Sequence, residues 1–246
     1  MLDTRKIGTI RNNAEWCDAF CRAHGKPGEF NTDMWLNRHP VPRFYPNVGT
    51  LVEPCQRQLD LIDELVASRL PPGWAVKDSF CMLDLASRGF QVLFVAEWIY
   101  LPVSRIRNIP TSGKATRWEV VRSHDALSEW ESAWSRAVGD VSEGRIFVPS
   151  LLENTKIAIV AGYRDSRIVA GAIANCSNNI VGWSNFFAPD SEVFDCAAAS
   201  LATISGVFPS LPIVGYEQAY ELRNAQALGF EALGPLRVWT FTASTA

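Results

Sequence analysis

Three β-type segments joined by short polar turns constrain the fold of this chain more than any other feature. They span residues 157–163, 168–174 and 180–187. The turns are Arg164-Asp165-Ser166 and Asn178-Asn179, and side chains of these types tolerate the backbone angles of tight hairpins. The pattern therefore predicts an antiparallel meander of three adjacent strands.

Helices and further strands flank this meander in an α/β order. A strand over 118–122 precedes it, followed by a helix that Gly139 ends. After the meander, Asp190 or Ser191 is predicted to cap a helix with an apolar stripe. The remaining elements are a strand over 212–216, a helix over 219–228 stopped by Gly229, and a last strand over 230–240 interrupted at Gly234-Pro235.

The first part of the chain predicts a shorter succession of similar elements. These are a helix over 11–24, an irregular loop over 25–43, a strand over 44–52, a helix with Pro54 in its first turn, a strand over 74–80, a short helix over 82–88 and a strand over 90–101. The last strand is almost wholly apolar, which is typical of burial on both faces. Residues 102–114 contain two prolines and a glycine and are interpreted as a linker.

The two parts repeat one order of elements. Phe44–Asn47 aligns with Gly182–Asn185 at an offset of 138 residues, and the same offset places Val76 on Val214. A Gly-Phe pair follows in both parts. The repeated order predicts an internal duplication whose first copy lacks the early strands.

Composition excludes several classes of function. The net charge is −3 and no dense basic run occurs, which argues against nucleic-acid binding. An apolar run of about 18 residues is absent, and the first residues lack the apolar core of a signal peptide. We therefore expect a cytoplasmic protein that does not bind membranes.

The cysteines offer one arrangement with metal-ligand spacing. Cys17, Cys21 and His24 would share one face of a helix, with His39 nearby. Buried thiols on an amphipathic helix explain the same spacing. We therefore assign no metal, and whether this trio binds anything stays open.

Two stretches of the second part resemble the GNAT-type N-acyltransferase superfamily. Residues 168–173 are similar to its third strand, and residues 225–231 are similar to the end of its last helix, where a Gly-Phe pair leads into the closing strands. With the element order, residues 115–246 resemble a GNAT domain and residues 1–108 a truncated copy with an N-terminal helical or irregular extension. The resemblance implies an α/β (α+β) fold of two related GNAT-like halves, whose mixed sheets contain antiparallel meander strands and a splayed parallel pair flanked by helices.

The resemblance also implies a binding site for acetyl-CoA or another acyl-CoA between the two splayed strands, here 180–187 and 212–216. The implied cofactor contacts are Trp183, Ser184, Asn185, Phe186, Phe187 and Gln218. In GNAT enzymes a glycine-containing loop cradles the pyrophosphate at the N-terminus of the next helix. The equivalent residues 188–193 contain no glycine and no basic residue, and they include Asp190 and Glu192. Residues 49–54 of the other copy offer one glycine and again an acid.

The catalytic residues implied by the resemblance lie beside the same strands. GNAT enzymes often use a tyrosine four residues before the Gly-Phe glycine, and that position here is Ala225. Glu217 is instead the implied base that takes a proton from the amine, and Tyr216 or Tyr220 the acid that protonates the departing thiolate. A dipole-complementing role for Glu217 and packing roles for the tyrosines remain the alternatives.

The function implied is transfer of an acyl group from acyl-CoA to an amine of a small molecule, peptide or protein. The alternative is a non-catalytic module that binds a small polar ligand. Its pockets would be lined by Trp183, Asn185 and Tyr216 in one copy and by Tyr45, Asn47, Lys77 and Asp78 in the other. A third reading is an interaction role in which the two copies pack their sheets together. The sequence leaves a homodimer open.

Overall fold

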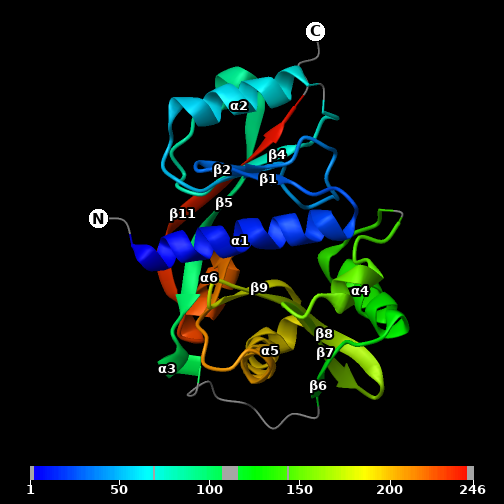
Figure 1. Cartoon of the computed structure of the whole chain (residues 1–246). Helices are drawn as coiled ribbons and strands as arrows, with labels where there is room; N and C mark the ends of the chain where they lie inside the picture. The colour runs from blue at the N-terminus through cyan, green and yellow to red at the C-terminus, as the bar shows by residue number, and fades with distance from the viewer. Residues whose placement is uncertain (1–2, 69, 107–115, 143, 243–246) are drawn as a thin grey trace. The chain divides into compact units, whose positions relative to one another are not determined.

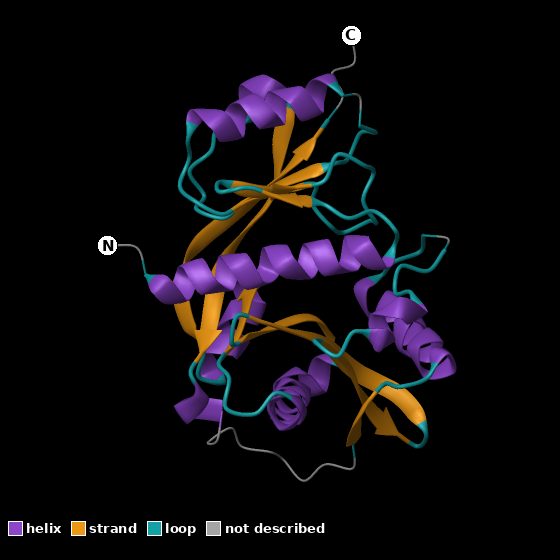
Figure 2. Ribbon diagram, viewed as in Figure 1, coloured by secondary structure: helices purple, strands orange, loops and turns teal. Residues whose placement is uncertain are grey.

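The structure is a computed structural model that describes residues 3–68, 70–106, 116–142 and 144–242 (Figure 1). Helices flank mixed β-sheet, which confirms the predicted fold class (Figure 2). The chain forms two compact units. Unit 1 contains the chain up to Trp98, Glu217–Ala219 and the residues from Leu233 onward, and unit 2 contains Ile99–Tyr216 and Tyr220–Ala232.

Unit 1 takes elements from both ends of the chain. They are α1 (Thr4–Ala23), β1 (Glu29–Phe30), β2 (Met34–Leu36), β3 (Val48–Thr50), α2 (Gln56–Ala67), β4 (Ala75–Asp78), the 3₁₀ turn η1 (Ala86–Arg88), and most of β5 (Phe90–Leu101) and β11 (Glu231–Phe241). The strand order is β1-β2-β3-β4-β11-β5. β3 and β4 are parallel, with Gly49 opposite Lys77, and β11 is antiparallel to β4.

The sheet of unit 1 has an apolar face and a more polar one. Val48, Val76 and Trp239 lie on the first, because residues in register across a sheet share a face. They form a buried cluster with Ile62 and Leu65 of α2. The opposite face packs against α1. There the Trp35 indole donates to Asp18 Oδ1 over 3.1 Å, and Lys77 Nζ donates to Asn13 Oδ1 over 2.7 Å.

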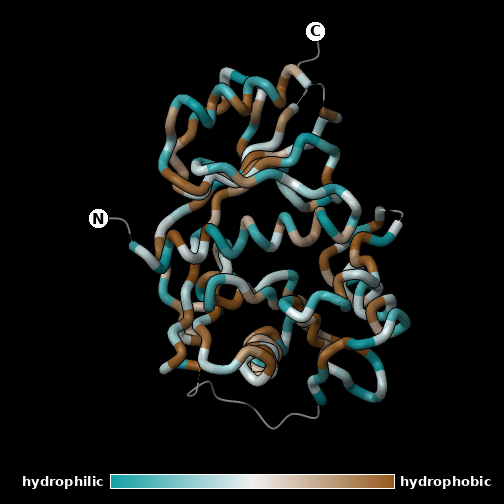
Figure 3. Tube along the Cα trace, viewed as in Figure 1, coloured by the Kyte–Doolittle hydropathy of each residue, from teal (hydrophilic) through white to brown (hydrophobic). Residues whose placement is uncertain are grey.

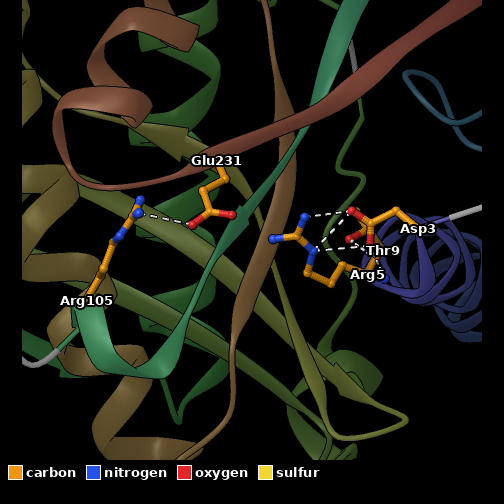
Figure 4. Close-up of polar contacts among 5 residues, drawn as sticks. All are labelled: Asp3, Arg5, Thr9, Arg105 and Glu231. Carbon is orange, nitrogen blue, oxygen red and sulfur yellow. Dashed lines mark hydrogen bonds and ion pairs between the residues drawn. The ribbon is translucent and has the colours of Figure 1, made fainter.

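Helix α1 begins earlier than the predicted residue 11. Asp3 caps it, because Asp3 Oδ1 accepts a hydrogen bond from the Arg5 amide over 2.9 Å. The Arg5 guanidinium also pairs with the Asp3 carboxylate, and the Thr9 hydroxyl donates to the Arg5 carbonyl (Figure 4). The cap lies eight residues upstream of the predicted start at residue 11.

Several other sequence predictions for unit 1 are wrong in detail. The irregular loop over 25–43 contains β1 and β2, which are too short to show an alternating pattern. Pro54 precedes the N-cap of α2, which is Cys55. β5 has its predicted bounds, but Val92, Leu93 and Val95 are 48%, 58% and 49% exposed, so this part of the strand is not buried on both faces. β11 is continuous, although Gly234 has φ +105°.

Unit 2 contains the predicted meander and its helices. Its elements are α3 (Val103–Ile106), β6 (Arg117–Val120), α4 (His124–Val138), the 3₁₀ turns η2 (Pro149–Glu153) and η3 (Asp190–Glu192), β7 (Ile157–Arg164), β8 (Arg167–Ser177), β9 (Ile180–Phe187), α5 (Val193–Val207), and most of β10 (Ile213–Glu217) and α6 (Ala219–Ala227). The strand order is β5-β10-β9-β8-β7-β6, where β5 contributes its last residues.

Both hairpins of the meander have the predicted turn chemistry. Asp165, Ser166, Asn178 and Asn179 all have positive φ, between 48° and 63°, which is the conformation of two-residue hairpin turns. The antiparallel meander is confirmed by the β7–β8 and β8–β9 registers.

Helices cover both faces of this meander. Ala172 and Ala174 of β8 share a buried cluster with Ala198 and Leu201 of α5, and Figure 3 shows largely apolar residues along that helix. Gly171 alternates with Ala172 and lies under Trp130 of α4 on the other face.

The predicted linker and duplication remain predictions. Residues 107–115, which form most of that linker, lie outside the described residues.

Within the part of the chain that the structure describes, every helix is too short or too polar to cross a lipid bilayer.

Candidate functional site

Strands β9 and β10 run parallel but pair with each other only at their first residues. Val181 lies opposite Ile213 and Gly182 opposite Val214. The Val181 amide donates to the Pro212 carbonyl over 3.0 Å. The register contains no pair beyond Gly182 and Val214, so the backbone of β9 after Gly182 does not pair with β10. The predicted splay of these two strands is confirmed.

The two strands separate immediately after a close backbone approach at Gly215. A Cβ atom at this position would lie 2.8 Å from the Trp183 carbonyl oxygen. Such a distance is below any normal contact, so only glycine fits without a shift of one strand. Gly215 thus fixes how close β10 comes to β9 before they part.

Strand β9 contains a β-bulge where it leaves β10. Ile173 of β8 lies opposite Ser184, whereas Gly171 lies opposite Phe187, so β9 has one extra residue in this interval. Asn185 in the bulge has φ +52°, a left-handed conformation that asparagine adopts more readily than most residues. Its Nδ2 donates to Ser184 Oγ over 3.1 Å. The bulge redirects the backbone of residues 184–187.

Aromatic packing supports the bulge from the α4 side. A Cβ on Gly171 would lie 2.2 Å from Trp130 Nε1 and 2.7 Å from the Phe187 ring. The Trp130 indole donates to the Val160 carbonyl over 3.0 Å, and its ring meets Phe147 and Phe187 edge-on. Each of these rings is buried, so the bulge rests on a rigid base.

The segment between β9 and α5 is acidic, and one arginine balances it. Glu192 is the N-cap residue of α5, and no side chain accepts a cap hydrogen bond there. The predicted cap by Asp190 or Ser191 is therefore wrong, because the 3₁₀ turn η3 places both residues before the helix. Arg164 of β7 forms an ion pair with the Glu192 carboxylate and donates to Thr116 Oγ1 over 3.2 Å. The hydrogen bond and charge of Glu192 raise the pKa of Arg164.

Comparison with known proteins yields structural matches only. No protein-family model and no curated protein matches the sequence. The GCN5-related N-acetyltransferase from Kribbella flavida superposes with a TM-score of 0.62 at 12% identity, covering 94% of this chain and 96% of that one. A GCN5-related N-acetyltransferase-like protein from Streptococcus suis gives 0.55 at 12% identity, covering 97% and 99%. A conserved protein of unknown function from Staphylococcus epidermidis gives 0.63 at 9% identity, covering 86% and 92%.

The chain has a GNAT-type fold. The matches extend over nearly the whole chain, whereas the sequence resemblance was carried mainly by residues 115–246.

In a GNAT-type fold the space between β9 and β10 is the place to test whether the residues present fit an acyl-CoA. The backbone of β9 beyond Gly182 is not paired with β10, which fits a bound arm with amide groups. The start of α5 fits a pyrophosphate less well, because Asp190 and Glu192 bring negative charge there. Among the described residues, Arg164 forms an ion pair with this segment through Glu192. The donor set thus fits an acyl-CoA along β9 and only partly at α5.

The catalytic residues that the sequence resemblance implies lie at the end of β10 and the start of α6. Tyr216 and Glu217 are the last two residues of β10 and are half-buried, and alternation along the strand points them to opposite faces. Gln218 is exposed. Tyr220 is 56% exposed, and the Arg223 guanidinium lies 5.6 Å from the centre of its ring. Tyr216 and Tyr220 belong to unit 2, whereas Glu217 and Gln218 belong to unit 1.

The cofactor contacts implied on β9 differ in exposure. Trp183 is 6% exposed, stacks on Phe230 at 5.8 Å between ring centres, and its indole nitrogen has no hydrogen-bond partner among the described residues. Ser184, Asn185 and Phe186 are half-buried, and Phe187 is buried in the aromatic cluster. The bulge and the parting of β10 therefore leave the middle of β9 as its accessible section.

The candidate binding residues of unit 1 divide between the two faces of its sheet. Tyr45 stacks on Phe20 of α1 at 3.8 Å between ring centres. Asn47 lies in the bend just before β3, and its amide donates to the Ala75 carbonyl over 2.8 Å. Lys77 and Asp78 are adjacent in β4 and point to opposite faces of the sheet. The Asn47 side chain donates to the Asn37 and His39 carbonyls, whereas Lys77 donates to Asn13, so these hydrogen bonds do not join the candidate residues in one site.

Asp78 anchors the turn after β4. Its carboxylate accepts hydrogen bonds from the Leu83 amide over 2.8 Å and the Phe80 amide over 3.3 Å. Burial raises the pKa of the Asp78 carboxyl, and these backbone hydrogen bonds oppose the rise. These contacts give Asp78 a role in the local backbone.

The thiols of α1 are buried. Cys17 and Cys21 are 3% and 0% exposed, and His24 lies against the Phe20 ring. Burial raises the pKa of Cys17 and raises that of Cys21 to about 12. Within the described ranges no group of three or more His, Cys, Asp or Glu side chains could hold a metal ion.

Sequence reasoning missed the residues that shape this site. Gly171 and Gly215 matter through close approaches to residues far along the chain. Arg164 was assigned to a turn, and its partner Glu192 lies 28 residues away. The sequence signal for this ion pair was an arginine at the end of one strand, Arg164, and an acid at the start of the following helix, Glu192.

Proposed function

We propose that this protein is an N-acyltransferase that moves an acyl group from acyl-CoA to an amine of a small molecule or a protein. The observation that carries the proposal is the parting of β9 and β10 after Gly182 and Val214 in a GNAT-type fold. A ligand that lies along β9 can satisfy backbone groups that a regular parallel ladder would have used. At the bulge around Asn185, the extra residue of β9 changes the direction of the backbone N–H and C=O groups from that of a regular strand.

Residues of this chain would hold the acyl-CoA at two places. The backbone of Trp183–Phe187 would bind its amide-containing arm. At the start of α5, the helix N-terminus attracts negative charge, and Arg164 is within reach because it already pairs with Glu192. When bound, the thioester supplies the activated acyl group.

Proton transfer is assigned to Glu217 and a tyrosine. The amine nitrogen forms a bond to the acyl carbon while the carbon–sulfur bond breaks. Glu217 accepts the proton that the amine loses, directly or through water, and Tyr216 or Tyr220 donates a proton to the leaving thiolate. Strand alternation sends Tyr216 away from Glu217, so Tyr220 on the following helix is the alternative donor.

Titration calorimetry with acetyl-CoA tests the cofactor part of this proposal. Saturable binding is expected, and Gly215→Val, which pushes a side chain against the Trp183 carbonyl, is expected to weaken it. Absence of binding at millimolar acetyl-CoA would remove the acyl-CoA assignment.

The catalytic part is tested by Glu217→Gln with a panel of amine acceptors. Turnover should fall by roughly a hundredfold or more while the affinity for acetyl-CoA stays within about twofold. Glu221→Gln is the matched control, because Glu221 is an exposed acid four residues away in α6. Equal turnover in the two variants would remove Glu217 from the mechanism.

A second candidate function, binding of a small polar ligand without catalysis, is favoured by one feature of unit 1. Asn47 is 1% exposed, and its Oδ1 atom accepts no hydrogen bond from the described residues. Two residues further along the chain, a Cβ on the buried Gly49 would meet no atom within 4 Å. A buried acceptor and open space close to it along the chain suit a small molecule with an N–H or O–H donor, or water.

A ligand screen by thermal shift tests this second function. A compound that raises the melting temperature of the wild type should lose its effect on Gly49→Val, which fills the space, and keep it on Gly206→Val, whose surroundings are equally open but lie in α5. Equal responses of both variants would exclude this site.

A further inference from the structure

Trp183 is the first residue of β9 beyond the last pair with β10, and its indole N–H lacks an acceptor. The side chain is 6% exposed, and the indole nitrogen has no hydrogen-bond partner among the described residues. Such a buried donor costs free energy, so buried indoles in folded proteins usually have a partner. Trp35, Trp98 and Trp130 are buried in the same way, and each donates its indole N–H to a carbonyl or carboxylate oxygen.

The surroundings of the Trp183 indole are apolar. Trp183 belongs to the buried cluster that contains Ala198 and Leu201 of α5, and it stacks on Phe230 at 5.8 Å between ring centres. A buried water needs two or more polar partners, so a cluster of this composition offers water little to bind. A ligand that brings its own acceptor oxygen satisfies this N–H better than water does.

The binding mode proposed above places the reactive end of the acyl-CoA next to Trp183. Its phosphates are assigned to the start of α5, which follows the end of β9 at Phe187. The amide-containing arm then runs back along the backbone of residues 183–187, which does not pair with β10. Trp183 is at the end of this section that is remote from α5, and the thioester therefore lies beside it.

We propose that the Trp183 indole N–H donates a hydrogen bond to the thioester carbonyl oxygen of the acyl donor. This inference rests on the proposed function and adds a catalytic residue to it. The carbonyl oxygen gains negative charge as the amine nitrogen bonds to the acyl carbon, and it loses that charge when the carbon–sulfur bond breaks. A fixed N–H donor at this oxygen stabilises the charge. Proton transfer remains with Glu217 and with Tyr216 or Tyr220.

Phe186 is the neighbouring ring with room to move when the acyl group enters. Its ring centre lies 5.1 Å from that of Trp183, and its side chain is half-buried, whereas Phe230 is 3% exposed. Phe186 also follows Asn185 in the β9 bulge, where the register with β8 is interrupted. A rotation of the Phe186 ring is therefore the change that we expect to let an oxygen atom reach the indole nitrogen.

Calorimetry with two ligands tests this hydrogen bond without relying on turnover. Acetyl-CoA has the thioester carbonyl, and coenzyme A with its free thiol lacks it. The wild type is expected to bind acetyl-CoA about fivefold more tightly, which is the ratio that one net hydrogen bond gives. Trp183→Phe keeps an aromatic ring and removes the N–H. It should bind the two ligands with affinities within about twofold of each other.

Trp74→Phe is the matched control for the loss of an indole N–H. Trp74 is 5% exposed, and its indole nitrogen also lacks a partner among the described residues, but it lies in the apolar cluster of unit 1. This variant should keep the preference for acetyl-CoA. Turnover with an amine acceptor should be at least about tenfold lower in Trp183→Phe than in Trp74→Phe.

NMR of the wild type supplies a readout that needs no variant and applies even if Trp183→Phe fails to fold. The indole N–H resonance of Trp183, assigned through its backbone, should move downfield when acetyl-CoA is added and move less with coenzyme A.

The outcomes separate this inference from the proposed function. If the wild type binds both ligands but shows no preference, or if Trp183→Phe keeps the preference of the wild type, the inference is overturned and the proposed function stands. An indole resonance that responds equally to both ligands has the same meaning. If the wild type binds neither ligand at millimolar concentration, the proposed function fails and the inference fails with it.

Discussion

Replacing Gly171 with alanine should destabilise unit 2, because the added methyl group has no room. Its Cβ would lie 2.2 Å from Trp130 Nε1, whereas ordinary contacts begin at 3.4 Å, so the indole must move by about 1 Å. Trp130 is 0% exposed and has no solvent side to move into. Overpacking of this kind costs about 1–3 kcal/mol. The displaced indole also loses its hydrogen bond to the Val160 carbonyl, which adds about 1 kcal/mol.

The expected total is a loss of about 2–4 kcal/mol in the free energy of unfolding. For a chain of this size it corresponds to a fall in melting temperature of about 5–15 °C. Thermal and urea unfolding, followed by circular dichroism and tryptophan fluorescence, measure both quantities. Gly206→Ala is the control, because Gly206 lies in α5 with open space around it and should gain about 0.5–1 kcal/mol.

The same variant connects packing to the proposed function. Phe187 also lies against Gly171, at 2.7 Å from the added Cβ, so the substitution should disturb the β9 bulge and weaken acetyl-CoA binding. A Gly171→Ala protein within about 0.5 kcal/mol of the wild type would refute the account of a rigid aromatic base, since surface substitutions vary by that much.

Three further predictions concern charge. Glu192→Gln should tighten acetyl-CoA binding several-fold in calorimetry, because it removes a negative charge from the start of α5 and releases Arg164, and an unchanged affinity would place the phosphates elsewhere. Burial raises the folded-state pKa of the Asp78 carboxyl, so its contribution to stability is complete below the unfolded pKa near 3.8 and is lost as pH rises through the folded pKa. Urea unfolding measured against pH should show this fall for the wild type and not for Asp78→Asn. Identical profiles of the two proteins would contradict the prediction. Cys17 and Cys21 should resist iodoacetamide at pH 8 while the half-buried Cys55 and Cys81 react, as mass spectrometry of peptides would show, and early labelling of Cys21 would be inconsistent with its raised pKa.

The sequence was most informative where local chemistry determines local structure. The bounds of β9 and the left-handed turn residues Asn178 and Asn179 follow from strand propensity and asparagine's tolerance of positive φ. The GNAT-type order of elements could be inferred for the same reason. The strands β1 and β2 could not, because two or three residues are too few to show a period.

The site depends on contacts between distant residues, which one sequence does not reveal. The place where β9 and β10 part is set by the approach of Gly215 to Trp183, 32 positions earlier. The exposed half of β5 was misread because an apolar run indicates burial only when neighbours exist on both sides. The balance of Glu192 by Arg164 likewise requires the fold to bring β7 beside the start of α5.

The contribution of β11 to unit 1 has a consequence for protein synthesis. Trp239 completes the apolar cluster on β4, yet it is synthesised 163 residues after Val76, its partner in that strand. Until then the edge of β4 that pairs with β11 stays open in the nascent chain, and open edges of this kind favour aggregation. A premature stop before Leu233 would consequently leave the sheet of unit 1 without the part of β11 that pairs with β4.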